Sequence, residues 1–250
     1  MERNIATKAI VLSSERSGNA DRRLRLLSED LGIIYVTSFG ARKSNKAVKV
    51  GFLADGTFFL YHNPVKNSYT LSDADIGSSH TAILEDLDAD YAAMCFCELL
   101  IRTNGGDQKA TYRLLKASLS ALETQVIPKS QVLIQFIWNL IDVLGMRPDL
   151  SCCPSCGRPY EENEILGFSY PLTAPCCQSC ATVDSSMLLP PGARRYLAFT
   201  CSMSFGQAVT VALSPAARQR IKRYLFRYVT MILGGRPLKT LEGSILQNMD

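Results

Sequence analysis

The stretch GIIYVTSFG, residues 32–40, decides how the first part of the chain folds. It places β-branched and aromatic residues in succession between two glycines, which is the composition of a short strand that ends in turns. Four segments of the same kind surround it: TKAIVLS (7–13), RLRLLS (23–28), GTFFLYHN (56–63) and NSYTLSDADI (67–76). Residues 21–31 would also suit a helix, through Leu24, Leu27 and Leu31. Strands this short and this close together predict a small β-barrel, which removes exposed sheet edges.

The apolar period changes after residue 79. Apolar side chains at helical spacing predict helices over 81–102, 112–122, 131–144, 191–203 and 214–233. The segment 131–144 is apolar almost all round, so we expect its helix at the centre of the body. Ser214 and Pro215 predict the start of the last helix, and Gly234 and Gly235 its end. The expected fold class is α+β with several domains: a barrel over 1–79, a helical domain over 80–150 and 188–250, and a cysteine-rich insertion over 151–187.

The composition is that of an ordinary folded protein, with 47% hydrophobic and 20% charged residues among 250. The first residues, MERNIATKAIVLSSERS, contain no apolar leader. No apolar run approaches the roughly 18 residues of a membrane span. We therefore expect a cytoplasmic chain without a membrane partner, whose thiols are reduced rather than paired in disulfides.

Six of the nine cysteines fall in SCCPSCGRP (151–159) and PCCQSC (175–180). Within them, Cys153, Cys156, Cys177 and Cys180 form the pattern CxxC-x20-CxxC. Each CxxC turn presents two thiolates to one ion, so the spacing predicts one structural Zn²⁺ with these four ligands. Cys152 and Cys176 stand one position earlier. Either of them could replace its neighbour with CxxxC spacing, or both could be bystanders.

Other uses of the cysteines find less support in the sequence. A redox CxxC follows a strand in a βαβ unit, and that context is missing. A catalytic zinc needs a general base nearby, whereas the chain's two histidines, His62 and His80, lie far away in the sequence. The chain has no phosphate-binding GxxxxGK[ST] loop, no GxGxxG and no serine nucleophile elbow. These observations favour a binding protein over an enzyme.

Charge is distributed unevenly along the chain. Residues 1–50 hold ten Lys/Arg and five Asp/Glu (+5), residues 51–100 one and eight (−7), and residues 201–250 seven and two (+5). Basic ends favour a polyanionic partner such as DNA. In the barrel, the candidate DNA-binding residues are Arg22, Arg23, Arg25, Arg42, Lys43, Lys46 and Lys49. The candidate base-stacking aromatics are Tyr35, Phe39, Phe58 and Tyr61, although we expect most of them in the core, because a strand buries one face.

A second basic set lies on the predicted helix 214–233, in a stretch (201–241) that contains no acidic residue. Its members are Arg218, Arg220, Lys222, Arg223 and Arg227. They are candidates for binding DNA or the tail of a protein.

The chain resembles the bacterial RecO family of DNA repair proteins over nearly its full length. The matching stretches are AIVLSSERSGNADRRLRLLSEDLGIIYVTSFGARKSNK (9–46), LGMRPDLSCCPSCG (144–157) and GGRPLKTLEGSIL (234–246). The resemblance implies an OB-fold for the barrel, and a protein of the cytoplasm that associates with the nucleoid. It implies a non-enzymatic mediator that binds single- and double-stranded DNA and anneals complementary strands. With RecR, such a mediator helps load RecA onto strands coated by single-stranded DNA-binding protein.

The resemblance also implies that the acidic, apolar C-terminal tail of the single-stranded DNA-binding protein is a partner of the basic helix. Two alternatives stay open on the residues alone: a zinc-ribbon adaptor that binds only protein, and a CxxC thiol oxidoreductase. The surface that binds RecR and the oligomeric state are also left open.

Overall fold

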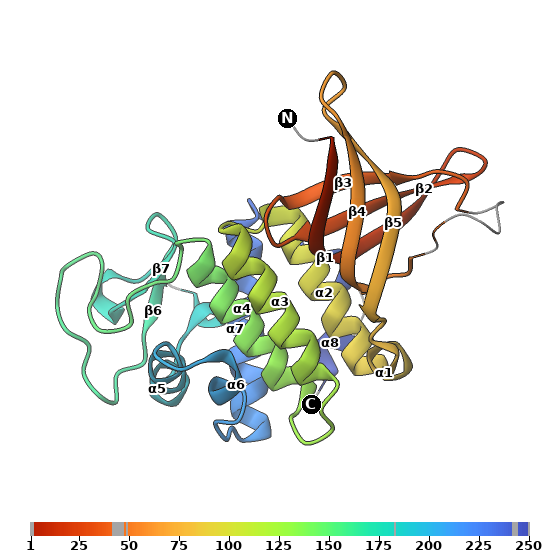
Figure 1. Ribbon diagram of the computed structural model, residues 1–250. Coiled ribbons are helices and arrows are strands. Elements are labelled where there is room, and N and C mark those ends of the chain that lie inside the picture. The colour runs from red at the N-terminus through yellow and green to blue at the C-terminus, as the bar shows by residue number, and fades with distance from the viewer. Residues whose placement is uncertain (1–2, 42–47, 49, 183, 242–244, 250) are drawn as a thin grey trace.

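The computed structural model describes residues 3–41, 48, 50–182, 184–241 and 245–249, apart from the side chains of Ser186 and Gln247. A β-barrel stands at one end of the molecule, above a layer of helices (Figure 1). The cysteine-rich segment lies beside the helices, on the side away from the barrel. The expected architecture of barrel, helical body and four-cysteine cluster is confirmed.

The barrel consists of β1 (Asn4–Ser17), β2 (Asp21–Ser28), β3 (Gly32–Ser38), β4 (Asp55–Asn63) and β5 (Ser68–Ser78). The strands close in the order β1-β2-β3-β5-β4, and only the β3–β5 pair is parallel. Alternate residues point inward, so Leu24, Leu26 and Phe58 fill the interior. A closed barrel of five strands agrees with the expected OB-fold, and residues 21–28 are strand rather than helix.

The outward face of β1 and β2 packs on the helical body at one end of the barrel. Ile10 and Leu27 pair across the two strands there, and both join the main core of the helices. At the start of β4, the Asp55 carboxylate accepts a hydrogen bond from the Tyr112 hydroxyl at 3.3 Å. It also lies 2.9 Å from the Lys116 ammonium. Apolar packing and a buried polar contact thus join the barrel to the helices.

The long helices of the body are α2 (Leu87–Thr103), α3 (Gln108–Leu122), α4 (Lys129–Val143) and α7 (Pro215–Ile232). The short ones are α1 (Thr81–Glu85), α5 (Pro191–Thr200), α6 (Phe205–Ala208) and α8 (Ile245–Asn248). Helix α4 is central, as predicted, because nearly all its side chains are buried. Its Gln131 amide donates to the carbonyls of Val209 and Val211, both at 2.7 Å. The Trp138 indole donates to the Leu197 carbonyl at 3.0 Å, so polar bonds also hold the short helices to α4.

The prediction of a single helix over 81–102 is wrong, because the chain breaks at Asp86. The backbone of Asp86 is extended, and its carboxylate accepts from the Ala89 N–H at 3.0 Å to cap α2. A good N-cap here outweighs the apolar periodicity. Helix α7 begins after Ser214 and ends before Gly234 and Gly235, as predicted.

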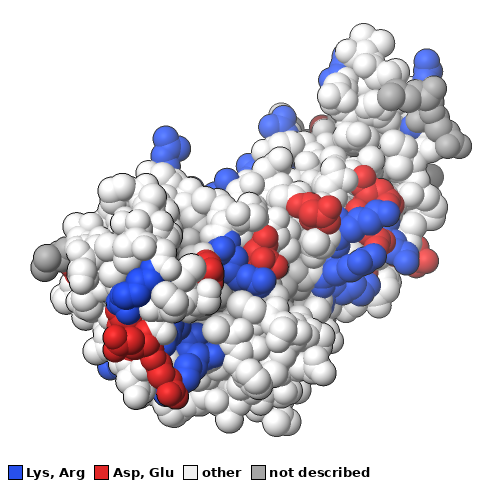
Figure 2. Space-filling view, turned by 90° about the vertical axis from the view of Figure 1, so that its left-hand side faces the viewer, with Lys and Arg blue, Asp and Glu red and all other residues white. Residues whose placement is uncertain are grey.

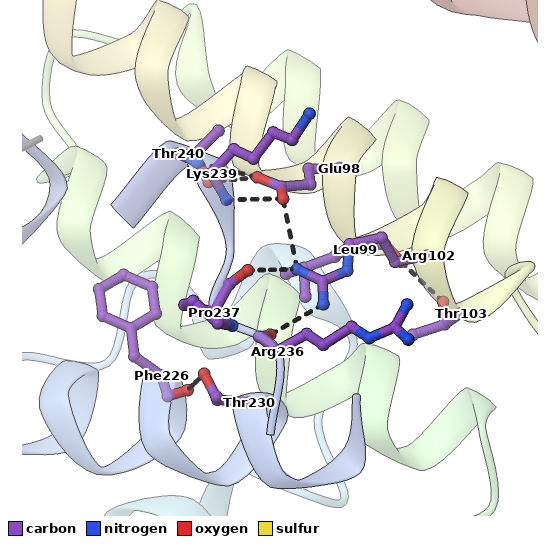
Figure 3. A network of polar contacts seen from close by, with 10 residues as sticks. All are labelled: Glu98, Leu99, Arg102, Thr103, Phe226, Thr230, Arg236, Pro237, Lys239 and Thr240. Atoms are coloured by element: carbon purple, nitrogen blue, oxygen red, sulfur yellow. Dashed lines mark hydrogen bonds and ion pairs between the residues drawn. The ribbon is translucent and has the colours of Figure 1, made fainter. Parts of the chain in front are cut away.

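After α7 the chain folds back across α2 (Figure 3). Glu98 and Arg102 of α2 bind the backbone of residues 236–240. The turn η3 (Lys239–Leu241) and α8 follow, and Leu238, Leu246 and Met249 are buried in the main core. We call residues 236–241 and 245–249 the C-terminal strap.

Candidate metal centre and nucleic-acid interface

The cysteine-rich segment folds into a small module around the two CxxC turns. Strands β6 (Gly167–Ser169) and β7 (Ala174–Cys176) pair antiparallel and lead into the turn η1 (Gln178–Cys180). At the first CxxC, the Gly157 N–H donates to the Cys153 carbonyl at 2.8 Å, and Gly157 has a φ of 73°. Glycine adopts this left-handed conformation without steric cost. At the second, the Cys180 N–H donates to the Cys177 carbonyl at 3.0 Å.

The two turns bring four sulfur atoms together. The Sγ atoms of Cys153, Cys156, Cys177 and Cys180 all lie within 4.8 Å of one another. Those of Cys156 and Cys177, which come from different turns, are 3.8 Å apart. Four thiolates at about 2.3 Å from a tetrahedral Zn²⁺ stand roughly 3.8 Å from each other. The donor set and its spacing therefore fit one such ion.

Backbone groups around Cys153 favour its thiolate form. Burial raises the pKa of this thiol, but N–H groups of Cys177, Cys156 and Ser155 donate to the sulfur and lower the pKa to about 6. The thiolate is the form that binds a metal. The module thus prepares a buried sulfur for ligation.

Cys152 and Cys176 remain outside the four-sulfur cluster. Cys152 is half-buried, and its Sγ lies 3.3 Å from Asp149 Oδ2. Cys176 is fully buried at the end of β7, and this burial together with nearby thiols raises its pKa to about 11. The geometry therefore favours the CxxC positions over the CxxxC alternatives.

The module packs on the helical body through buried side chains. The Phe168 ring of β6 lies in the main core, with its centre 6.0 Å from that of Tyr228 on α7. Arg194 of α5 is 7% exposed and donates to the carbonyls of Glu161 and Glu162. Sequence reasoning missed Arg194, since its partners are backbone groups about thirty residues away.

The outward face of β2 and β3 carries part of the predicted DNA-binding set. Arg23 and Arg25 are two positions apart on β2 and share that face, and Tyr35 on β3 is the register partner of Arg25. The Arg25 guanidinium lies 5.1 Å from the centre of the Tyr35 ring, and Tyr35 is 55% exposed. We call Arg23, Arg25 and Tyr35 the β2–β3 strip.

The remaining barrel candidates do not extend this strip. Arg22 follows the inward alternation of Leu24, and its guanidinium donates to Ser14 Oγ at 2.9 Å. The candidates Arg22, Arg23 and Arg25 therefore do not share one face, because adjacent strand residues point to opposite faces. Four predicted residues lie outside the described residues: Arg42, Lys43, Lys46 and Lys49.

The aromatic candidates also divide by strand face. Phe58 is fully buried in the barrel, so its prediction as a base-stacking residue is wrong. Phe39 and Tyr61 are exposed, as is Phe59, which the sequence reasoning missed. Strand alternation was the signal that could have found Phe59: if Phe58 points inward, its neighbour points out.

Helix α7 places its apolar residues inward, and three of its predicted basic residues are exposed: Arg220, Arg223 and Arg227. Lys222 was a candidate for binding DNA or a protein tail but is 2% exposed, and its ammonium donates to the Met249 carbonyl at 2.6 Å. Arg218 is half-buried and donates to the Leu213 carbonyl at 2.8 Å. The strap covers the side of the helix where Lys222 lies, so this residue stabilises the fold.

A cleft of about 790 Å³ lies between α7, the cysteine module and the C-terminal strap. Arg223 and Arg227 line its basic side, and Met187, Phe226 and Leu241 contribute apolar surface. The cleft therefore combines positive charge with an apolar wall. On the face of the molecule that Figure 2 shows, the larger groups of basic side chains adjoin acidic ones. Sums of charge along the sequence thus overstate the local positive field.

The sequence of this chain is similar to sequences of known proteins. A family model described as "Recombination protein O C terminal" matches residues 84–242, which include most of the helices and the cysteine module. The chain belongs to the RecO family. It is 29% identical to the "DNA repair protein RecO" of Bacillus pumilus over 90% of this chain and 87% of that protein. It is 25% identical to the protein of the same name from Caldanaerobacter subterraneus, over 91% and 92% of the two chains.

A third RecO relative, from Clostridium novyi, is 22% identical over 94% of this chain and 91% of its own. The similarity to RecO proteins thus includes the barrel as well as the helical body. Within the described part of the chain, no helix has the length and apolar character needed to cross a membrane.

Proposed function

We propose that this protein is a non-enzymatic mediator of DNA repair and recombination. It binds single- and double-stranded DNA and anneals complementary single strands. With RecR, it helps load RecA onto strands coated by single-stranded DNA-binding protein. Membership of the RecO family supports this class of function. The β2–β3 strip supports direct contact with DNA.

One observation carries the proposal: the Arg25 guanidinium lies over the Tyr35 ring on the outward face of an OB-like barrel. OB-folds bind oligonucleotides on the face of strands 2 and 3. Proteins that bind single strands combine cationic side chains for phosphates with aromatic rings on which bases stack. Arg23 and Arg25 supply the charge, and Tyr35 supplies an exposed ring in contact with the Arg25 guanidinium.

Annealing follows from the same contacts. Side chains that bind phosphates and stack on the face of one base leave most Watson–Crick edges of the strand free. A second strand can therefore pair while the first is bound. Neutralisation of phosphates by Arg23 and Arg25 also weakens the repulsion between strands. None of these steps needs nucleotide hydrolysis.

We divide the chain into three domains: the barrel over 1–79, the helical domain over 80–150 and 188–250, and the cysteine module over 151–187. We assign the cysteine module a structural role. The ligands of one Zn²⁺ are Cys153, Cys156, Cys177 and Cys180. The ion would cross-link the two CxxC turns and offset part of the negative charge of their four thiolates. The module then holds Phe168 against Tyr228 of α7 and supports that helix.

The cleft beside α7 supports a second contact, with the acidic and apolar C-terminal tail of the single-stranded DNA-binding protein. Carboxylates of such a tail would meet Arg223 and Arg227, and its apolar side chains would meet Phe226. A tail bound here leaves the β2–β3 strip available for DNA.

Fluorescence anisotropy with a labelled single strand tests the proposal. Arg25→Ala/Tyr35→Ala is expected to weaken binding at least tenfold and to slow annealing without ATP, since stacking contributes about 1–3 kcal/mol per base. The matched control is Arg195→Ala/Phe199→Ala, which removes an exposed arginine and an exposed aromatic ring from α5, outside the barrel. Equal affinities for both double variants would refute the assignment to the strip. Annealing that required ATP hydrolysis by this chain would contradict the proposed mechanism.

A further inference from the structure

Glu15 of β1 lies directly beside the β2–β3 strip. In the antiparallel register Glu15 pairs with Arg23, and Ser13 pairs with Arg25. The Glu15 side chain therefore shares the outward face with both arginines, whichever rotamer it adopts. Its Oε1 lies 3.8 Å from Arg25 Nη2.

Arg25 is consequently held between two groups. Its guanidinium lies 5.1 Å from the Tyr35 ring centre, and one of its nitrogens reaches toward the Glu15 carboxylate. The Arg25 side chain is 26% exposed and that of Glu15 is 61% exposed, so the carboxylate is the partner more accessible from water. A phosphate that approached Arg25 would meet this carboxylate first.

Asp21, which alternates onto the same face, does not compete in this way. Its Oδ1 accepts a hydrogen bond from the Gly40 N–H at 2.9 Å, so it is tied to the backbone at the far end of the strand. Among the described residues, the Glu15 side chain accepts no hydrogen bond from the backbone, and its ion pair is with a residue of the strip itself. Glu15 is therefore the acidic residue on this face whose carboxylate competes with a phosphate for Arg25.

We propose that Glu15 lowers the affinity of the β2–β3 strip for strands: it occupies Arg25 in place of a phosphate and must be displaced when a strand binds. This inference rests on the proposed binding of DNA at the strip. Displacement returns the Glu15 carboxylate to water, where it gathers a counterion. Binding therefore releases fewer ions than two free arginines would allow, and the strip holds strands weakly enough to pass them on.

The test compares Glu15→Gln with Asp30→Asn in the full chain. The two acids are matched, because Asp30 also forms an exposed ion pair, with Lys109 at 3.9 Å, and its side chain is 60% exposed. The probe is a fluorescent single-stranded oligonucleotide, titrated at several salt concentrations. Glu15→Gln is expected to tighten binding about two- to fivefold at low salt, the range of a surface ion pair. It should steepen the slope of log affinity against log salt by up to about 0.7, one further phosphate.

Asp30→Asn should change neither quantity, and Glu15→Gln should have no effect once Arg25 is alanine. If Glu15→Gln leaves binding unchanged or weaker while Arg23→Ala/Arg25→Ala weakens it, Glu15 is no competitor and the proposed function stands. Equal tightening by Glu15→Gln and Asp30→Asn would mean a general effect of net charge and would overturn the inference. Unchanged binding by Arg23→Ala/Arg25→Ala would overturn the strip and this inference together.

Discussion

Glu98 and Arg102 lie one turn apart on α2, with Glu98 Oε1 3.5 Å from Arg102 Nη1, and both bind the same C-terminal strap (Figure 3). The carboxylate accepts from the backbone N–H groups of residues 239–240 at 2.7 and 2.9 Å. The guanidinium donates to the carbonyls of residues 236–237 at 2.8 and 2.6 Å. The two side chains are 15% and 21% exposed, so these charge-assisted bonds are largely shielded from water. Through them α2 satisfies backbone groups of an irregular segment.

Arg102→Ala is expected to lower the free energy of unfolding by about 2 kcal/mol, because two strap carbonyls lose a charged donor. Urea denaturation measures the change. The control is Arg113→Ala, an exposed arginine on α3, for which we expect a change within about 0.5 kcal/mol. If the two variants lost the same free energy of unfolding, the contact between Arg102 and the strap would not be the source of the stabilisation.

The contribution of Glu98 should depend on pH. Burial raises the pKa of this carboxyl, but the N–H groups of Thr240 and Lys239, the Thr240 hydroxyl and Arg102 together hold it below its usual value of 4.5. The folded protein therefore favours the ionised form, and the stabilisation is present above pH 4.5. It is lost as the pH falls through the folded pKa. The urea midpoints of wild type and Glu98→Gln should thus differ at pH 7 and converge below pH 4.5. If the difference between the two urea midpoints grew as the pH fell, the ionised Glu98 carboxylate would not be the stabilising form.

The spacing of apolar residues predicted those parts of the fold in which the pattern of neighbouring residues decides which side chains are buried. The five strands and the buried helix α4 are of this kind. The break between α1 and α2 could not be predicted from apolar spacing, because it depends on one capping carboxylate, Asp86. The burial of Lys222 depends on Met249, which lies 27 positions later in the chain. No local pattern contains such a contact.

The four-sulfur cluster could be predicted because each CxxC turn fixes its own two thiols, which leaves only the approach of the turns to tertiary structure. The residues that we propose to contact DNA could be assigned to a face only from the register of the barrel. Arg22 and Arg23 differ by one position and lie on opposite faces, as do Phe58 and Phe59. A shift of one residue reverses every such assignment. Composition and sums of charge cannot tell which residues of a strand point outward.

Purified protein is expected to contain about one Zn²⁺ per chain. Cys156→Ser or Cys180→Ser should lose the metal and melt at a lower temperature, because the energy of metal binding is folding energy. Metal analysis and thermal denaturation measure both effects. Cys152→Ser makes the same chemical change next to a ligand but outside the cluster, and should retain metal and stability. Single-strand binding by the barrel should partly survive in Cys156→Ser and Cys180→Ser. A stable wild type without metal would contradict the assignment.

The dependence of DNA affinity on salt should identify which basic surface holds the strand. Each phosphate neutralised on a single strand contributes a slope of about −0.7 in log affinity against log salt. Arg23→Ala/Arg25→Ala should therefore flatten the slope by about 0.7 to 1.4, the lower value if displaced Glu15 takes up one counterion. Binding should weaken equally for all sequences, since phosphate contacts carry no base information. Tyr35→Ala should lower affinity at an unchanged slope, because stacking releases no counterions. The loop variant Arg42→Ala/Lys43→Ala/Lys46→Ala is expected to flatten the slope by roughly two units.

The alternative is that α7 carries the DNA. The comparison is Arg220→Ala/Arg223→Ala/Arg227→Ala, which removes three exposed charges from a helix whose inward face is left intact. If the strip holds the strand, this triple variant should keep the wild-type slope and lose only affinity for a labelled acidic, apolar peptide. If α7 holds the strand, the triple variant should flatten the slope by about two units while the strip variant leaves it unchanged. Both outcomes come from one set of titrations with one oligonucleotide, and folding is not in question because exposed charges contribute little to stability.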